Sequence, residues 1–220
     1  MATYDLEEQE QIDNLKAWWK LYGNLVTSAL LAVAVAAAGW QGWNWYQRNQ
    51  AAQASVIFNA LQQAVYARDT QKIKVTAGEL AEKFGSTTYA PLGALISARA
   101  LLDAGDVKTA HTQLSWAVSH GDNEVRDLAR LRLAAVMLDE NTPDEALKQL
   151  DATPAPAFAA RYAEMRGDIL AIQGKKAEAR QAYKQAVDKL TGEAVGNDSR
   201  PLTPYRDIVQ QKLDSLGENG

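Results

Sequence analysis

Two stretches of the sequence, GDVKTAHTQLSWA (residues 105–117) and GKKAEARQAYKQA (residues 174–186), share one pattern of residue types. In each, a glycine is followed by an alanine five positions on, then by a large side chain (Leu114 or Tyr183), then by another alanine. Alanines and large apolar residues at three- and four-residue steps are typical of packed helices. A frame that recurs in this way indicates a chain built from repeated helical hairpins.

A weaker third copy lies between the two, with Asn141, Ala146 and Leu150 at the same offsets. Upstream of each copy, a small residue is followed three positions later by a large one. These pairs are Ala98 and Leu101, Ala134 and Met137, and Gly167 and Leu170. We expect the small residue to let two antiparallel helices approach, and the glycine or asparagine to end the first helix in the left-handed conformation. The frame and its period of ~34 residues are those of tetratricopeptide (TPR) repeats.

The sequence therefore predicts an all-α fold in which a TPR-like α-solenoid of helical hairpins follows a single amino-terminal membrane helix. The expected repeats cover residues 91–119, 127–155 and 160–190. Pro154 and Pro156 should cut the second helix of the middle repeat short.

Flanking segments complete this prediction. Residues 51–68 and 72–84 are expected to be helices that together form an eroded first repeat. Thr203 can cap a helix with Pro204 at its first position, and Gly217 can stop it. The resulting helix, over residues 204–216, would cover the exposed end of the solenoid.

The membrane helix is predicted from an uncharged gap between Lys20 and Arg48. About 20 apolar residues are needed to cross the hydrocarbon core, and residues 21–46 supply them. Five of the six tryptophans lie at the two ends of this gap. The flanking aromatic residues are Trp18, Trp19 and Tyr22 before it, and Trp40, Trp43, Trp45 and Tyr46 after it. Two aromatic clusters one bilayer apart are typical of interfacial belts.

Two other interpretations of the apolar segment compete with an anchor. A buried helix of a soluble protein would not need both aromatic belts. A cleaved signal peptide would use residues 25–38 as its apolar region and Ala36 and Ala38 as its cleavage site. The leader is long and acidic rather than short and basic, which favours the anchor.

Positive charges near the segment predict its orientation. Lys16 and Lys20 precede it, and only Arg48 follows closely, so residues 1–20 should form a cytoplasmic leader with a juxtamembrane helix. Residues 47–220 should then form an extracytoplasmic domain. Within the segment, Ala34, Ala38 and Gly42 form a line of small residues that could pack against another membrane helix. A segment that is so rich in alanine can also contain such a line by chance.

Composition argues against several classes of function. The chain has 220 residues, a net charge of −4 and no cysteine, so it lacks the basic patch of a nucleic-acid-binding protein and any thiol chemistry. No phosphate-binding loop, dinucleotide fingerprint or nucleophile elbow is present. Neither His111 nor His120 has a neighbour at metal-ligand spacing. We therefore expect no catalytic, cofactor or metal site.

A binding groove is the better candidate, because the first helices of stacked TPRs line a concave face. The inward positions of this frame are Leu92, Leu95, Arg99, Leu102 and Asp103, then Leu128, Leu131, Ala135, Leu138 and Asp139, then Arg161, Glu164, Asp168, Ala171 and Ile172. A groove rich in leucine at one end and charged at the other would suit an extended chain segment or an amphipathic helix. The alternative is that these leucines are core residues covered by neighbouring helices.

The leader and anchor, EEQEQIDNLKAWWKLYGN (residues 7–24) and GWQGWNWYQRNQ (residues 39–50), together with the repeats behind them, resemble the ancillary SecYEG translocon subunit (YfgM-like) family of Gram-negative bacteria. The resemblance implies an inner-membrane protein with a cytoplasmic leader and a periplasmic TPR domain. It also implies association with the SecYEG channel and a PpiD-like chaperone, help for newly exported client proteins, and a cytoplasmic regulator bound through the leader. The degenerate middle repeat and the longer tail past Leu190 depart from the family pattern.

Three hypotheses about function follow. The first is a translocon accessory that binds partners through its TPR groove. The second is a scaffold for cell-envelope assembly or division, which would bind envelope machinery and no client. The third, an envelope enzyme, has no motif in its favour.

Overall fold

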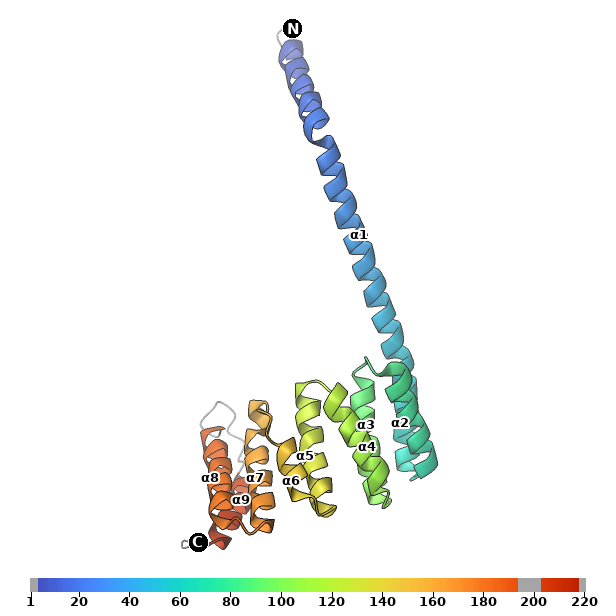
Figure 1. The fold of residues 1–220 in the computed structure, drawn as a ribbon. Helices are drawn as coiled ribbons and strands as arrows, with labels where there is room; N and C mark the ends of the chain where they lie inside the picture. Colours follow the sequence, from blue (N-terminus) through green and yellow to red (C-terminus); the bar gives the residue numbers. More distant parts are fainter. Residues whose placement is uncertain (1–3, 194–202, 218–220) are drawn as a thin grey trace. The chain divides into compact units, whose positions relative to one another are not determined.

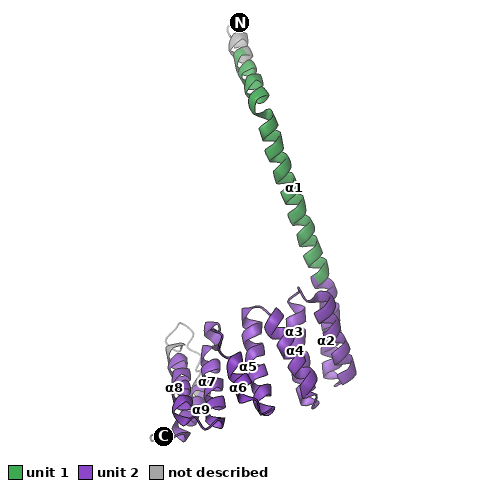
Figure 2. Ribbon diagram, in the orientation of Figure 1, with its two compact units in different colours: residues 1–50 green, residues 51–220 purple. Residues whose placement is uncertain are grey.

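The computed structural model describes residues 4–193 and 203–217, which are helical apart from short connections (Figure 1). The helices are α1 (Tyr4–Tyr66), α2 (Thr70–Phe84), α3 (Tyr89–Asp103), α4 (Val107–His120), α5 (Asn123–Asp139), α6 (Pro143–Gln149), α7 (Pro156–Ile172), α8 (Lys176–Glu193) and α9 (Thr203–Ser215). Neither described range contains a strand, and the predicted all-α class is confirmed. The chain divides into two compact units, residues 1–50 and 51–220 (Figure 2).

In the first unit, the described residues belong to one helix. The juxtamembrane helix, the membrane helix and the helix expected at 51–68 are all parts of α1. No proline occurs between residues 4 and 66, and a single glycine costs a helix only about 1 kcal/mol relative to alanine. Gly23, Gly39 and Gly42 therefore do not interrupt α1.

Side chains of the apolar part of α1 are almost all exposed. Leu21 is 76 % exposed and Trp40 is 69 % exposed. This helix is long and apolar enough to cross a membrane, and only 6 % of its most apolar window is buried. The core helix of a soluble protein would be covered by neighbouring elements, so that alternative does not fit α1.

The second unit begins with the last turns of α1 and continues through antiparallel helices in sequence order. Ala54, Leu61 and Ala64 of α1 are buried, and the Phe58 and Tyr89 ring centroids lie 5.4 Å apart. Helices α2, α4 and α5 each begin after an aspartate whose carboxylate accepts a backbone N–H. The three bonds are Asp69 to Lys72 N (3.0 Å), Asp106 to Thr109 N (3.1 Å) and Asp122 to Val125 N (3.0 Å).

The turns between paired helices have the predicted backbone conformation. Gly105, Asn141 and Gly174 have φ values of 81°, 59° and 74° after α3, α5 and α7. In this region a Cβ atom is strained, so glycine or asparagine is favoured. The glycine or asparagine that the three copies share therefore marks the end of the first helix in each pair.

The middle pair differs from its neighbours because α6 has only seven residues. It ends at Gln149, before Pro154, as the prolines predict. Pro156, however, does not belong to the end of this pair, because it is the first residue of α7. Proline is favoured there because its missing N–H would have had no partner within the helix.

Small residues set the distance between neighbouring helices, both within a pair and between pairs. A Cβ added at Gly167 would lie 2.5 Å from two ring atoms of Tyr183, and one at Gly93 would lie 2.7 Å from Leu80 Cδ1. Ala98 and Ala134 are fully buried at the corresponding positions of the other pairs. Buried residues form two clusters, a large one from α1 to α7 and a smaller one from α7 to α9.

Candidate functional site: a groove across the helical repeats

Three adjoining pockets form a groove over the first helices of the pairs, called the repeat groove below. Their volumes are 560, 170 and 380 Å³. Arg132 of α5 lines all three, while Arg99 lines the first two and Ala135 lines the last two. The pockets therefore adjoin one another, from α1 and α3, across α5, to α7 and Tyr205 of α9.

Many of the sequence-predicted positions line this groove. They are Arg99, Leu102, Asp103, Leu128, Leu131, Ala135, Asp139, Arg161, Glu164 and Asp168. TPR geometry brings these residues together from helices far apart in the sequence.

The remaining predicted positions lie elsewhere. Leu95 is only 5 % exposed and belongs to the core, while Leu92 and Leu138 are half-buried outside the three pockets. Ala171 is partly buried against the second core cluster, and the Ile172 side chain is 63 % exposed beyond the groove. Apolar residues beside a helix–helix contact are covered by the neighbouring helix, so an inward frame position alone does not make a leucine accessible.

Arginines occupy the end of the groove where leucines were expected. Arg68, Arg99 and Arg132 line the same pocket. Arg132 Nη1 donates to the backbone oxygen of Leu95 at 3.3 Å, which ties α5 to α3. Burial, together with the charge of Arg99, lowers the pKa of the Arg132 guanidinium. Arg99 is paired with Asp103, with Nε 3.1 Å from Oδ1.

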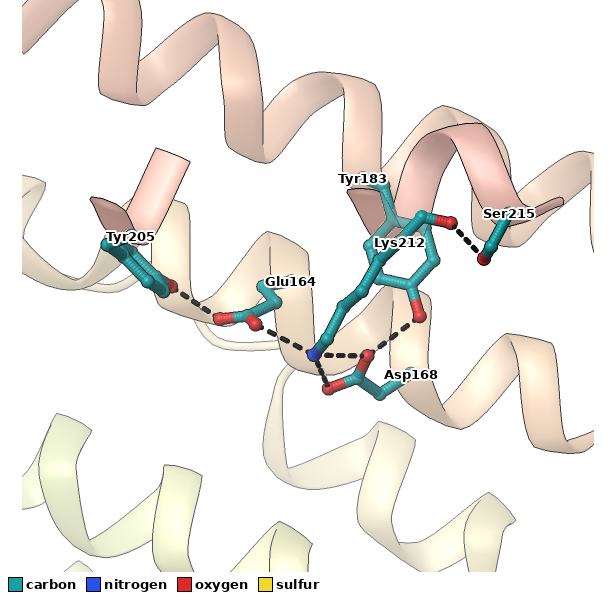
Figure 3. Close-up of polar contacts among 6 residues, drawn as sticks. All are labelled: Glu164, Asp168, Tyr183, Tyr205, Lys212 and Ser215. Carbon is teal, nitrogen blue, oxygen red and sulfur yellow. Dashed lines mark hydrogen bonds and ion pairs between the residues drawn. The ribbon is translucent and has the colours of Figure 1, made fainter. Parts of the chain in front are cut away.

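The opposite end of the groove holds two carboxylates, both of which pair with one lysine of α9 (Figure 3). Lys212 Nζ lies 2.8 Å from Glu164 Oε1 and 2.8 Å from both carboxylate oxygens of Asp168. Tyr205 Oη donates to Glu164 Oε2 at 2.5 Å, and Tyr183 Oη donates to Asp168 Oδ1 at 2.7 Å. These two carboxylates are therefore hydrogen-bonded and charge-paired within the chain.

The electrostatics of this cluster follow from its geometry. Burial and the hydrogen bonds to Asp168 and Glu164 raise the pKa of the Tyr183 and Tyr205 hydroxyls above the ordinary value. Burial alone would lower the pKa of Lys212, but hydrogen bonds to Asp168 and Glu164 outweigh it and raise that pKa. The cluster therefore retains its protons more strongly than the unfolded chain does.

Sequence reasoning placed a capping helix here and missed its polar contacts. Tyr205 and Lys212 are seven residues apart, two helical turns, and so share one face of α9. Val209, on the same side, is fully buried. That spacing was the available signal, but it did not identify the partners on α7.

A further polar cluster, also missed, fixes the connection between α6 and α7. Asp127 is 4 % exposed, and its carboxylate accepts the Ala155 N–H at 2.7 Å and the Tyr162 hydroxyl at 3.1 Å. Burial and the Asp127 charge raise the pKa of Tyr162. These bonds satisfy buried polar groups and have a structural role.

Neither histidine belongs to these two polar clusters. Among the side chains that the structure describes, no group of three or more histidine or acidic residues is placed to hold a metal ion. His111 Nδ1 lies 3.1 Å from Glu140, and the His120 ring stacks on Trp116 with centroids 4.2 Å apart. Both are surface contacts.

The line of small residues in α1 is accessible in the single chain. Ala34, Ala38 and Gly42 are exposed, and a Cβ added at Gly42 would meet nothing within 4 Å.

Comparison with known proteins places the chain in a family. The profile of the tetratricopeptide repeat-like domain matches residues 16–218. A relative from Neisseria gonorrhoeae, named ancillary SecYEG translocon subunit, is 32 % identical over 98 % of this chain and 100 % of its own length. The chain belongs to the ancillary SecYEG translocon subunit family. The member from Haemophilus influenzae is 31 % identical to this chain, over 84 % of this chain and 90 % of its own length. The member from Escherichia coli is 30 % identical, over 98 % of this chain and 99 % of its own length.

A solved structure supports the fold of this family member. MamA from Desulfovibrio magneticus, from residue 41 to its end, has a TM-score of 0.50 and 19 % identity to it, over 75 % of this chain and 89 % of MamA. At this identity the likeness concerns the arrangement of helices alone.

Proposed function

We propose that the chain is a non-enzymatic, single-pass accessory of the SecYEG translocon in the bacterial inner membrane. Its amino terminus lies in the cytoplasm and its repeat domain in the periplasm. There, with a PpiD-like chaperone, it assists newly exported proteins and binds its partners through the repeat groove. The match over the full length of relatives named as translocon subunits, anchor included, carries this proposal.

The physical features of the two units agree with this function. The part of α1 between Lys20 and Arg48 is uncharged, exposed and flanked by tryptophans, which suits a helix surrounded by a bilayer. A groove formed by several helices offers an extended surface for a protein segment rather than a closed cavity for a small molecule.

Topology is tested with single cysteines, because the natural chain has none. Glu10→Cys should be protected from a membrane-impermeant maleimide in intact spheroplasts, and Lys184→Cys should be labelled. The reverse pattern would refute the orientation. The mass of the purified protein tests the signal-peptide alternative, since cleavage would remove the leader.

Photo-crosslinking in living cells tests the partners. A photoreactive amino acid replaces Trp40 in the anchor or Arg161 in the groove, and the exposed Lys184 of α8 serves as the control position. We expect SecYEG subunits at Trp40, and chaperone or exported chains at Arg161 but not at Lys184. Capture of envelope-assembly or division proteins at both test sites, with no channel subunit, would favour the scaffold hypothesis instead.

A further inference from the structure

The charged side chains of the repeat groove are unevenly distributed along it. Lys212 pairs with both Glu164 and Asp168, which leaves one negative charge there, and Arg99 pairs with Asp103. No carboxylate among the described side chains lies within 4.0 Å of the guanidinium of Arg68, Arg132 or Arg161. Against these three cations, Asp139 is the carboxylate lining the groove that has no ion pair among the described residues. With Lys212 counted, five cations face four carboxylates, and the positive excess lies in the pocket that Arg68, Arg99 and Arg132 line together with Asp103.

Arg132 is the centre of this positive charge. It lies in the middle helix of the groove, half-buried, and lines each of the three pockets. The bond to Leu95 O holds the side chain across the gap between α5 and α3. An arginine has five N–H donors, so most of those on Arg132 remain available to a ligand.

The surroundings of Arg132 would favour an anion. Removing a guanidinium from water without a counter-charge is unfavourable, and the charge of Arg99 adds repulsion. A carboxylate bound between the two would relieve both costs, since arginine and carboxylate form short, paired hydrogen bonds.

Apolar side chains line the groove on both sides of Arg132. Ile96 of α3 lines one pocket, and Leu128, Leu131 and Met165 of α5 and α7 line another. A ligand that fits this surface has an anionic group with apolar groups on either side. A protein segment with an acidic residue between leucine-like residues has that chemistry.

We propose that the repeat groove binds an acidic, apolar segment of a protein partner, with a carboxylate of the segment on Arg132 and its apolar side chains on Ile96 and Leu128. This chemistry of the partner adds to the proposed function. It rests on the proposed function in one respect, that the repeat groove is the binding surface. A basic segment is disfavoured beside Arg132, because Arg68 and Arg99 line the same pocket.

Fluorescence anisotropy with two labelled peptides tests this inference on the full chain in nanodiscs. One probe is a nine-residue peptide with two glutamates among leucines and serines, and the other has lysines in place of the glutamates. We expect the glutamate peptide to bind at least about tenfold more tightly than the lysine peptide. Binding should weaken as salt is raised from about 50 to 300 mM, because the contact is ionic.

Arg132→Gln keeps a polar side chain and removes the charge, and should weaken binding of the glutamate peptide about tenfold. Arg130→Gln is the matched control, since Arg130 is on the same helix, is equally half-buried and lies near Tyr162 outside the groove pockets. It should leave binding unchanged. Thermal unfolding by circular dichroism checks that both variants fold.

Equal affinity for the two peptides, or equal losses in the two variants, would overturn the inference. These outcomes are separable from a failure of the proposed function. Crosslinks from Arg161 to export partners, together with no preference for acidic peptides, would refute only the chemistry assigned to Arg132. Acidic-peptide binding without any translocon partner in cells would refute only the export role.

Discussion

The two core clusters of the repeat unit are held together by different means. The cluster from α1 to α7 consists of interlocking alanines and large apolar residues, with Leu61, Leu80, Leu101 and Leu114 fully shielded from solvent. The cluster from α7 to α9 is smaller, and polar bonds from Lys212, Tyr183 and Tyr205 surround it. Tyr205 and Lys212 of α9 bond to carboxylates of α7, so specific polar contacts supplement the apolar packing of this helix. The carboxyl-terminal end should therefore depend more on charge and pH than the amino-terminal end.

The largest expected effect is a cavity in the first cluster. Leu61→Ala should cost about 2–5 kcal/mol, because a fully buried leucine loses its contacts and leaves a void. Val209→Ala, at the equally buried centre of the second cluster, should cost about 1–2 kcal/mol, since it removes two methyl groups. Urea unfolding followed by circular dichroism measures both values. Equal costs would remove the distinction between the clusters.

Overpacking at the junction of α7 and α8 should have the next largest effect. Gly167→Leu should cost about 1–3 kcal/mol, because a side chain there meets the Tyr183 ring, which is itself fixed by Asp168. Gly78→Leu is the control, since a Cβ at Gly78 meets nothing within 4 Å. Thermal unfolding of both variants provides the measurement. Unchanged stability in Gly167→Leu would contradict the repeat frame.

Removing the cation of the second cluster should have a smaller effect. Lys212→Met leaves Glu164 and Asp168 facing each other without a counter-charge, and should cost about 1 kcal/mol because the pair is partly exposed to solvent. Hydrogen exchange should show faster opening of α9, while α2 and α3 stay unchanged. Faster exchange throughout the unit would mean that the two clusters are not separate.

Alkaline pH should act mainly on the second cluster, which holds three groups with a raised pKa, whereas Tyr162 is the corresponding group of the first. The pKa values of Tyr183, Tyr205 and Lys212 are raised in the folded chain, above 10.0 for the tyrosines and 10.5 for the lysine. Their stabilisation is complete below those unfolded values and is lost as the pH rises through the higher folded ones. Urea midpoints should therefore fall as the pH is raised above about 10. A Tyr183→Phe and Tyr205→Phe double variant should show a shallower fall, whereas Tyr66→Phe, at an exposed residue, should follow the natural chain.

Local features of this chain were readable from its sequence. The left-handed turns at Gly105, Asn141 and Gly174 and the short α6 follow from residue type and position. The small residues at 98, 134 and 167 followed from the same frame. Each of these depends on steric limits that act within a few residues or across one hairpin.

The charge pattern of the groove was not readable in this way. Glu164 and Lys212 are 48 positions apart, so their ion pair depends on how the hairpins stack. Frame positions placed Leu95 and Arg99 alike on the inner face. Only the packing of α3 against α5 showed that the leucine is buried and that Arg132 lies in the middle of the groove.

The sequence by itself determined the helices, their turns and the apolar anchor segment, because steric limits and the alternation of apolar and polar residues act along the chain. The tertiary structure alone decided which charges are neutralised and which remain available to a partner. Glu164 and Asp168 are paired because α9 places Lys212 beside them, while no described carboxylate is paired with Arg132. Coulomb interactions depend on distance in space, which residue order along a folded chain does not fix.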